Sequence, residues 1–117
     1  MTTEKKIDVT GRQYVPTVSI HPAGLTITQT TLAVTASSQT LIAANTNRRY
    51  LAWMIIGTAD VTISPASPVV VATGLIYQAA GAGKQGASQE WISNAPQNAF
   101  YAIAAATGST VVIWEGV

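Results

Sequence analysis

The side chains that could carry chemistry are few in this sequence and lie far apart. The chain has one histidine, His21, and the carboxylates after residue 22 are Asp60, Glu90 and Glu115. Catalysis by side chains needs titratable groups that converge on one place, and His21 has the setting of a surface or interface residue. Asp60 has the setting of a turn residue. The carboxylate pair that remains for a glycosidase is Glu90 and Glu115, which would have to flank one glycosidic bond. We expect no catalytic residues and a protein that is not an enzyme.

The sequence also has few residues that could bind a metal ion or a cofactor. With one histidine and no cysteine the usual zinc ligand sets cannot form, and the sequence has no spaced acidic loop of the calcium-binding type. Residues 81–86, GAGKQG, have a superficial likeness to a phosphate-binding loop. However, that motif requires glycine and a hydroxyl residue where Gln78 and Gln85 stand. We expect no metal and no cofactor, and we interpret residues 79–86 as a flexible glycine-rich loop.

Two arginines, Arg48 and Arg49, open a predicted strand that also contains Tyr50 and Trp53. Arginine beside aromatic residues can hold single-stranded nucleic acid. Yet the net charge is only +1, and neighbouring strand residues point to opposite faces, so the two arginines do not form one basic patch. We expect no nucleic-acid binding and interpret Arg48 and Arg49 as candidate anchors of a subunit contact.

Three tryptophans raise the alternative of sugar binding, since exposed aromatic rings can stack on sugars. Trp53 and Trp114 lie within apolar strands, and we interpret them as core or interface residues. Trp91 follows the glycine-rich segment and is the tryptophan expected to be most exposed. If the chain binds a glycan, Trp91 is the candidate for ligand stacking.

The low charge content points toward association with other subunits. Charged residues make up 9% of the chain, against about 25% in typical soluble domains. Copies with a net charge of +1 repel one another only weakly, and isolated charges are costly to bury in a contact. The composition favours a surface that other subunits largely cover, with a neutral single globule as the alternative.

The first 22 residues differ from the remainder. They hold five of the chain's eleven charged residues, together with Pro16 and Pro22, which interrupt any helix. We predict an extended N-terminal arm over residues 1–22 that lies against a partner or a neighbouring subunit, with a frayed terminus as the alternative. The candidate contact residues of this arm are Ile7, Val9, Arg12, Tyr14, Val18 and Ile20.

Residues 23–117 have the pattern of a single β-sandwich domain with about eight short strands between turns. A slip in the apolar alternation predicts a turn or bulge between Gln29 and Leu32. Hairpin connections are predicted at residues 57–60 and 107–109. Residues 48–56 are apolar on both faces, which predicts a strand in the centre of a layered core or against another subunit. We predict an all-β, jelly-roll-like sandwich.

The chain shows no sign of a membrane segment or a signal peptide. Its apolar stretches, such as residues 51–56, are far shorter than the ~20 residues that span a bilayer. The first residues, MTTEKK, are polar and no apolar segment follows them. We expect that the protein is made in the cytoplasm and that it does not contact a membrane.

Two segments resemble parts of small structural proteins of tailed phages. Residues 38–51, SQTLIAANTNRRYL, are similar to a short strand and turn that lead into the central strand of those proteins. Residues 99–104, AFYAIA, and 108–116, GSTVVIWEG, are similar to their last hairpin, which often ends in EG. The sequence departs from the pattern at residues 56–60, IGTAD, where these proteins often have an Asn-rich turn.

The resemblance implies a β-sandwich that forms part of a virion, as a head decoration, fibre base or tail component, with no catalytic residues. We expect a non-enzymatic decoration or cement protein that binds the major capsid protein or other virion proteins, stabilises the head shell and forms a homo-oligomer, with a trimer favoured. The alternative is a tail or fibre module that binds a host glycan or receptor. Both roles would place the protein in the virion.

Overall fold

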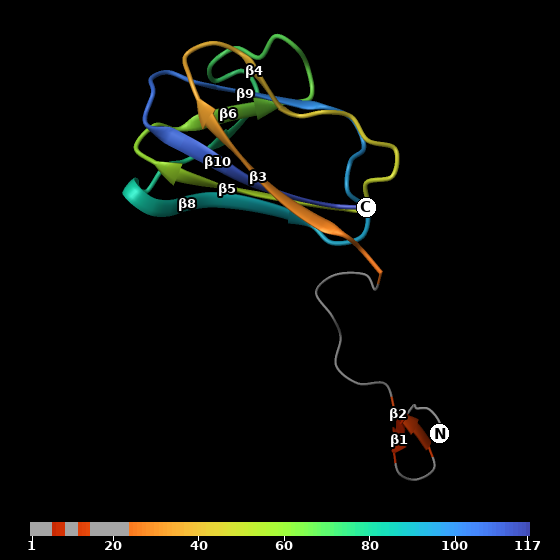
Figure 1. Ribbon diagram of the computed structural model, residues 1–117. Coiled ribbons are helices and arrows are strands. Elements are labelled where there is room, and N and C mark those ends of the chain that lie inside the picture. The colour runs from red at the N-terminus through yellow and green to blue at the C-terminus, as the bar shows by residue number, and fades with distance from the viewer. Residues whose placement is uncertain (1–5, 9–11, 15–23) are drawn as a thin grey trace.

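The protein folds into two antiparallel sheets packed face to face (Figure 1). The computed structural model describes residues 6–8, 12–14 and 24–117. Within these residues the fold is all-β, as predicted, and no helix is long and apolar enough to cross a membrane. Each sheet of the sandwich has four strands.

The sheet that we call the long sheet has the strand order β3-β10-β5-β8. Its strands are β3 (Ile27–Val34), β10 (Ser109–Gly116), β5 (Tyr50–Gly57) and β8 (Gly81–Trp91). The other, which we call the short sheet, has the order β4-β9-β6-β7, with β4 (Gln39–Ile42), β9 (Phe100–Ala104), β6 (Val61–Ser64) and β7 (Leu75–Tyr77). Except for β6 and β7, successive strands alternate between the two sheets. This strand order confirms the predicted jelly-roll-like sandwich.

The core forms between the sheets because alternate residues of each strand point inward. Trp53 is at its centre on β5 and is 1% exposed. Its ring makes edge contacts with Tyr77, Trp91 and Phe100, at centroid distances of 5.9, 5.1 and 5.1 Å. Burial of each large apolar side chain contributes about 1.5–3 kcal/mol, so this aromatic cluster is a major source of stability.

The two predicted hairpins at residues 57–60 and 107–109 are wrong, because both segments cross from one sheet to the other. β5 and β6 lie in different sheets, as do β9 and β10. The two crossings touch: Ala59 N donates to Ser109 Oγ at 2.8 Å, and Ser109 Oγ donates to Ala59 O. Gly57, with φ of +135°, has Gly108 O where a Cβ would lie. Glycine and short polar residues occur both in hairpin turns and in crossings between sheets. The sequence pattern alone therefore does not distinguish a hairpin from a crossing.

The turn or bulge predicted between Gln29 and Leu32 is also wrong. β3 pairs with β10 in one continuous register, from Ile27 opposite Gly116 to Val34 opposite Ser109. The apolar alternation changes because the first five residues of β3 are exposed on both faces, whereas Leu32 and Val34 point to the core. The strand itself is uninterrupted.

The glycine-rich segment interpreted as a loop, residues 79–86, largely belongs to strand β8. β8 pairs with β5 from Gly81 to Trp91, with register shifts beside Ile56. Glycine in a strand often marks such an irregularity, because the missing side chain permits local distortion. The sequence indicated flexibility where the structure has an irregular strand.

The N-terminal arm contains a small antiparallel pair where it is described. β1 (Lys6–Asp8) pairs with β2 (Arg12–Tyr14), with Ile7 opposite Gln13. The backbone positions of Ile7, Arg12 and Tyr14 are therefore in strands. Val9, Val18 and Ile20 lie outside the described residues.

Candidate functional site

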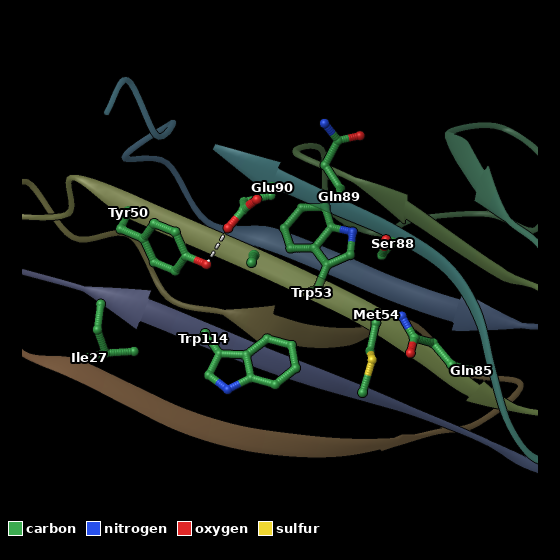
Figure 2. A pocket seen from close by; sticks show the side chains of 10 residues that line it. Ile27, Tyr50, Trp53, Met54, Gln85, Ser88, Gln89, Glu90 and Trp114 are labelled. Carbon is green, nitrogen blue, oxygen red and sulfur yellow. Dashed lines mark hydrogen bonds between the residues drawn. The ribbon is translucent and has the colours of Figure 1, made fainter. Parts of the chain in front are cut away.

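The face of the long sheet that points away from the core, which we call the outer face, carries an open groove. Its volume is about 480 Å³, and all four strands of the sheet contribute to it. The lining residues are Ile27, Tyr50, Ala52, Met54, Gln85, Ser88, Glu90 and Trp114, together with Trp53 and Gln89, whose side chains point to the core (Figure 2).

Strand β5 explains why this face is apolar. Leu51, Trp53 and Ile55 point to the core, so the residues between them, including Ala52 and Met54, point to the outer face. The strand predicted to be apolar on both faces is thus central in its sheet, between β10 and β8. Its second apolar face forms the floor of the groove.

Trp114 is the aromatic residue that the groove presents to solvent. It lies on β10 opposite Gln29 of β3 and Ala52 of β5, and it is half-buried. The indole Nε1 donates to Gln29 Oε1 at 2.9 Å. The ring lies between Ile27 and Met54 in the view of Figure 2. The hydrogen bond fixes the indole, so its accessible surface is a preformed apolar platform.

Tyr50 and Glu90 form the polar end of the groove. The Tyr50 hydroxyl donates to Glu90 Oε2 at 2.7 Å (Figure 2). Burial, the hydrogen bond to Glu90 and the negative charge of Glu90 raise the pKa of Tyr50 to about 12. Tyr50 is therefore a neutral hydrogen-bond donor at physiological pH, beside an exposed carboxylate.

Arg48 is buried within its own subunit, so the prediction that it anchors a subunit contact is wrong. Its side chain is 0% exposed. Nε donates to Glu115 Oε2 at 2.8 Å. The other nitrogens donate to three backbone carbonyls, those of Pro96 at 2.7 Å, Asn98 at 2.9 Å and Ala43. A buried guanidinium needs such partners, and these fix two loops, residues 43–49 and residues 92–99, to the end of β10. Arg49 is exposed, and its interface role stays a prediction.

Trp91 is not the exposed tryptophan that the sequence indicated. It lies on the core side of β8, half-buried, opposite Leu51 of β5. Its ring contacts Trp53 edge-on at 5.1 Å and stacks on Phe100 at 6.2 Å. The tryptophan on the outer face is Trp114, because the alternation of β10 turns it away from the core.

The carboxylates do not converge. Glu90 lies opposite Ala52 and Glu115 opposite Leu51, so the two point to opposite faces of the long sheet. Asp60 Oδ1 accepts a hydrogen bond from Ala79 N at 2.9 Å. Among the described residues, no group of three His, Cys, Asp or Glu side chains lies close enough to hold a metal ion.

A second surface feature is an apolar patch at one edge of the short sheet. It is formed by the start of β7 and the loop before it, and it contains Val70, Val71, Leu75 and Ile76. These side chains are 56, 41, 57 and 52% exposed. Sequence reasoning missed this apolar patch, although prolines 65 and 68 and the apolar run after them were a signal that a short edge element carries apolar side chains outward.

Comparisons with known proteins give little similarity. No protein-family model matches the chain, and no curated protein sequence matches it. Among solved structures it is similar to a chain from Bacillus endospore appendages, described as a novel family of disulfide-linked pili, at 15% identity. The match covers 90% of this chain and 99% of that one, with a TM-score of 0.43.

Proposed function

We propose that this chain is a non-enzymatic structural protein of a tailed-phage virion, a decoration or cement protein that binds the head shell. The resemblance of residues 38–51 and 99–116 to small phage structural proteins supports this proposal. The jelly-roll sandwich and the 9% content of charged residues are compatible with it. The protein partner is the major capsid protein or another virion protein.

The observation that carries the proposal is the apolar patch of Val70, Val71, Leu75 and Ile76. Four large apolar side chains that are 41–57% exposed lie within seven residues of sequence. Large apolar side chains that are exposed in one short segment favour a site of protein association. Each side chain is far enough from the core that its apolar area remains available for burial against a partner.

Shell binding would stabilise the particle by mass action, because a protein that binds only the assembled shell favours the assembled state. Copies would bind where capsid subunits meet, as a homo-oligomer for which the sequence favours three copies. The N-terminal arm, with Ile7, Arg12 and Tyr14, would latch onto the shell or onto a neighbouring copy. Arg49 remains exposed for the same contact.

The experiment is co-sedimentation of the purified protein with shells of the major capsid protein encoded in the same genome. Ile76→Ser should weaken binding strongly, whereas Ile92→Ser should not. The two isoleucines are 52 and 45% exposed, so the second is a matched control for the loss of one exposed apolar side chain. Removal of residues 1–20 should abolish binding if the arm is the latch. Wild-type protein that stays in the supernatant would contradict shell binding.

A second candidate function is a tail or fibre module that binds a host glycan or receptor, and the groove on the outer face favours it. Trp114 offers an aromatic platform, and the hydroxyl of Ser88, the amide of Gln85 and the carboxylate of Glu90 lie along one side. Aromatic surface beside a few hydrogen-bonding groups is the usual composition of a small-ligand site.

This alternative is tested by tryptophan fluorescence across a broad panel of sugars. Binding in the groove should change the emission of wild-type protein and be lost in Trp114→Ala. No response from any sugar would remove the glycan function and leave shell binding unaffected. A response that survives in Trp114→Ala would place the site elsewhere on the molecule.

A further inference from the structure

Strand β3 forms an edge of the long sheet, and its free side has no pairing strand in the part of the chain that the structure describes. It pairs with β10 through every residue from Ile27 to Val34, without a register shift. Its sequence, ITQTTLAV, contains no charge, proline or glycine, and its first five residues are exposed. A long, regular edge presents unpaired backbone N–H and C=O groups, which makes it a template for another strand. On β3, the carbonyl of Ala33 accepts a hydrogen bond from Gln39 Nε2 at 3.3 Å.

The other three edges of the two sheets carry the features that block such pairing. β8 contains Gly81, Gly83 and Gly86, the charged Lys84, and register shifts against β5. β4 has only 4 residues and a register shift against β9, and β7 has only 3 residues. β3 therefore differs from every other edge of the sandwich.

We propose that β3 is a self-association edge, at which two copies of this chain pair their β3 strands antiparallel about a twofold axis. The two four-stranded long sheets would then form one continuous sheet. A second copy fits because the strand is neutral and the chain carries a net charge of only +1, so charge does not oppose pairing. Threonine, isoleucine and valine, which make up most of β3, are the residues that pair best in sheets.

Sheet geometry restricts the register of this contact. Residues opposite each other in a sheet point to the same face, and a twofold axis perpendicular to the sheet keeps each face on its own side. One residue of β3 must therefore lie directly opposite its own counterpart. Thr30 and Thr31 are in the middle of the strand, so an axis at either of them would form the largest number of backbone hydrogen bonds.

The pairing also has a consequence for the outer face. Ile27, which is 36% exposed, and Gln29, which holds the Trp114 indole, both belong to β3. A second β3 strand beside them would cover Ile27 and bring two copies of the groove onto one continuous face. The β3 contact would form a dimer, whereas the sequence favours a trimer. The proposed dimer does not depend on shell binding.

Because the chain contains no cysteine, single-cysteine variants give a direct test. Cysteine is placed in turn at Thr28, Gln29, Thr30, Thr31 and Leu32, and each protein is oxidised mildly. Cα atoms of directly opposed residues lie about 4.5–5.5 Å apart, within the range that a disulfide spans. We expect disulfide-linked dimers to form rapidly at one of these positions. Thr40→Cys, an exposed threonine on the edge strand β4, is the control.

A second variant tests the contact without a covalent bond. Thr30→Lys places two ammonium groups close together across the twofold axis and should raise the dimer dissociation constant at least about tenfold. Thr40→Lys should leave it unchanged, and circular dichroism confirms that both variants fold. A monomer or a trimer in solution, or crosslinking on β3 no faster than at Thr40→Cys, would overturn the inference. Loss of shell binding alone would count against the proposed function only.

Discussion

Arg48 Nε donates to Glu115 Oε2 at 2.8 Å, which joins the segment before β5 to the end of β10 across 67 positions of sequence. The arginine side chain is fully buried, and that of Glu115 is 24% exposed. Three backbone carbonyls accept the remaining hydrogen bonds of the guanidinium. This buried ion pair holds the loops at one end of the sandwich together.

Replacing Arg48 with alanine should destabilise the fold by about 3–5 kcal/mol, because the change leaves the Glu115 carboxylate and several carbonyls without their donor. The measurement is urea unfolding followed by tryptophan fluorescence. Arg49→Ala is the matched control: Arg49 is the next residue and is exposed, so its loss should change stability by less than about 0.5 kcal/mol. Equal effects of the two substitutions would contradict the buried role of Arg48.

Tyr50 should titrate well above an ordinary tyrosine, because its pKa is raised to about 12 by burial and by Glu90. The pKa in the folded state exceeds the unfolded value of 10.0. The resulting stabilisation is fully present below about pH 10 and is lost as pH rises toward about 12. Absorbance of the tyrosinate form and unfolding free energies across this range measure both effects.

Glu90→Gln separates the causes of this shift. The amide keeps a hydrogen-bond acceptor for Tyr50 but removes the negative charge, so the pKa of Tyr50 should fall while burial continues to hold it above 10.0. A pKa that is unchanged in Glu90→Gln would show that the negative charge of Glu90 does not contribute to the shift.

Local alternation predicted the class of fold, whereas the strand pairing decided the connections. The two-faced apolar pattern around Trp53 predicted a central strand, because the period of two is a local property of the backbone. The segment after Gly57 was predicted as a hairpin, yet it crosses between sheets, since β5 pairs with β10 and β8 and not with β6. Such long-range pairing leaves no mark in the turn residues themselves.

The candidate site was predicted only in part for the same reason. The sequence identified Arg48, Trp91 and Trp114 as notable residues, but burial of each depends on which neighbours the fold supplies. Arg48 meets Glu115 only because β10 returns beside β5. Trp91 faces the core and Trp114 faces the outer side of the long sheet. These orientations follow from the registers in which β8 and β10 pair with β5, and those registers cannot be predicted from the residues around each tryptophan.

Truncation of the two tryptophans should destabilise the fold to different extents. Trp91 contacts Trp53 and Phe100, so Trp91→Ala should lower the unfolding free energy by about 3 kcal/mol through the cavity it leaves. Trp114 is half-buried on the outer face, and Trp114→Ala should destabilise the fold by less. Thermal unfolding of both variants checks the order, and a larger loss for Trp114→Ala would contradict this description of the core.

The contact between the two sheet crossings should tolerate no added side chain. Gly57 has φ of +135°, and a Cβ there would lie 2.1 Å from Gly108 O and 2.6 Å from Ser109 Cα. Both obstacles are backbone atoms, which cannot rotate away as a flexible side chain would. Gly57→Ala should therefore lower the unfolding free energy by at least about 3 kcal/mol, through backbone strain and displacement of the second crossing.

Gly83→Ala separates backbone strain from the clash, since Gly83 also has a positive φ, +69°, but no atom lies within 4 Å of its Cβ position. Only the strain applies at this site, so the loss should be about 1–2 kcal/mol. Urea unfolding of the two variants measures the difference. Similar losses would mean that the crossings move apart at little cost, and the contact between Gly57 and Gly108 would then not help to hold the two sheets together. A clearly larger loss for Gly57→Ala would show that the contact between the crossings contributes to joining the sheets.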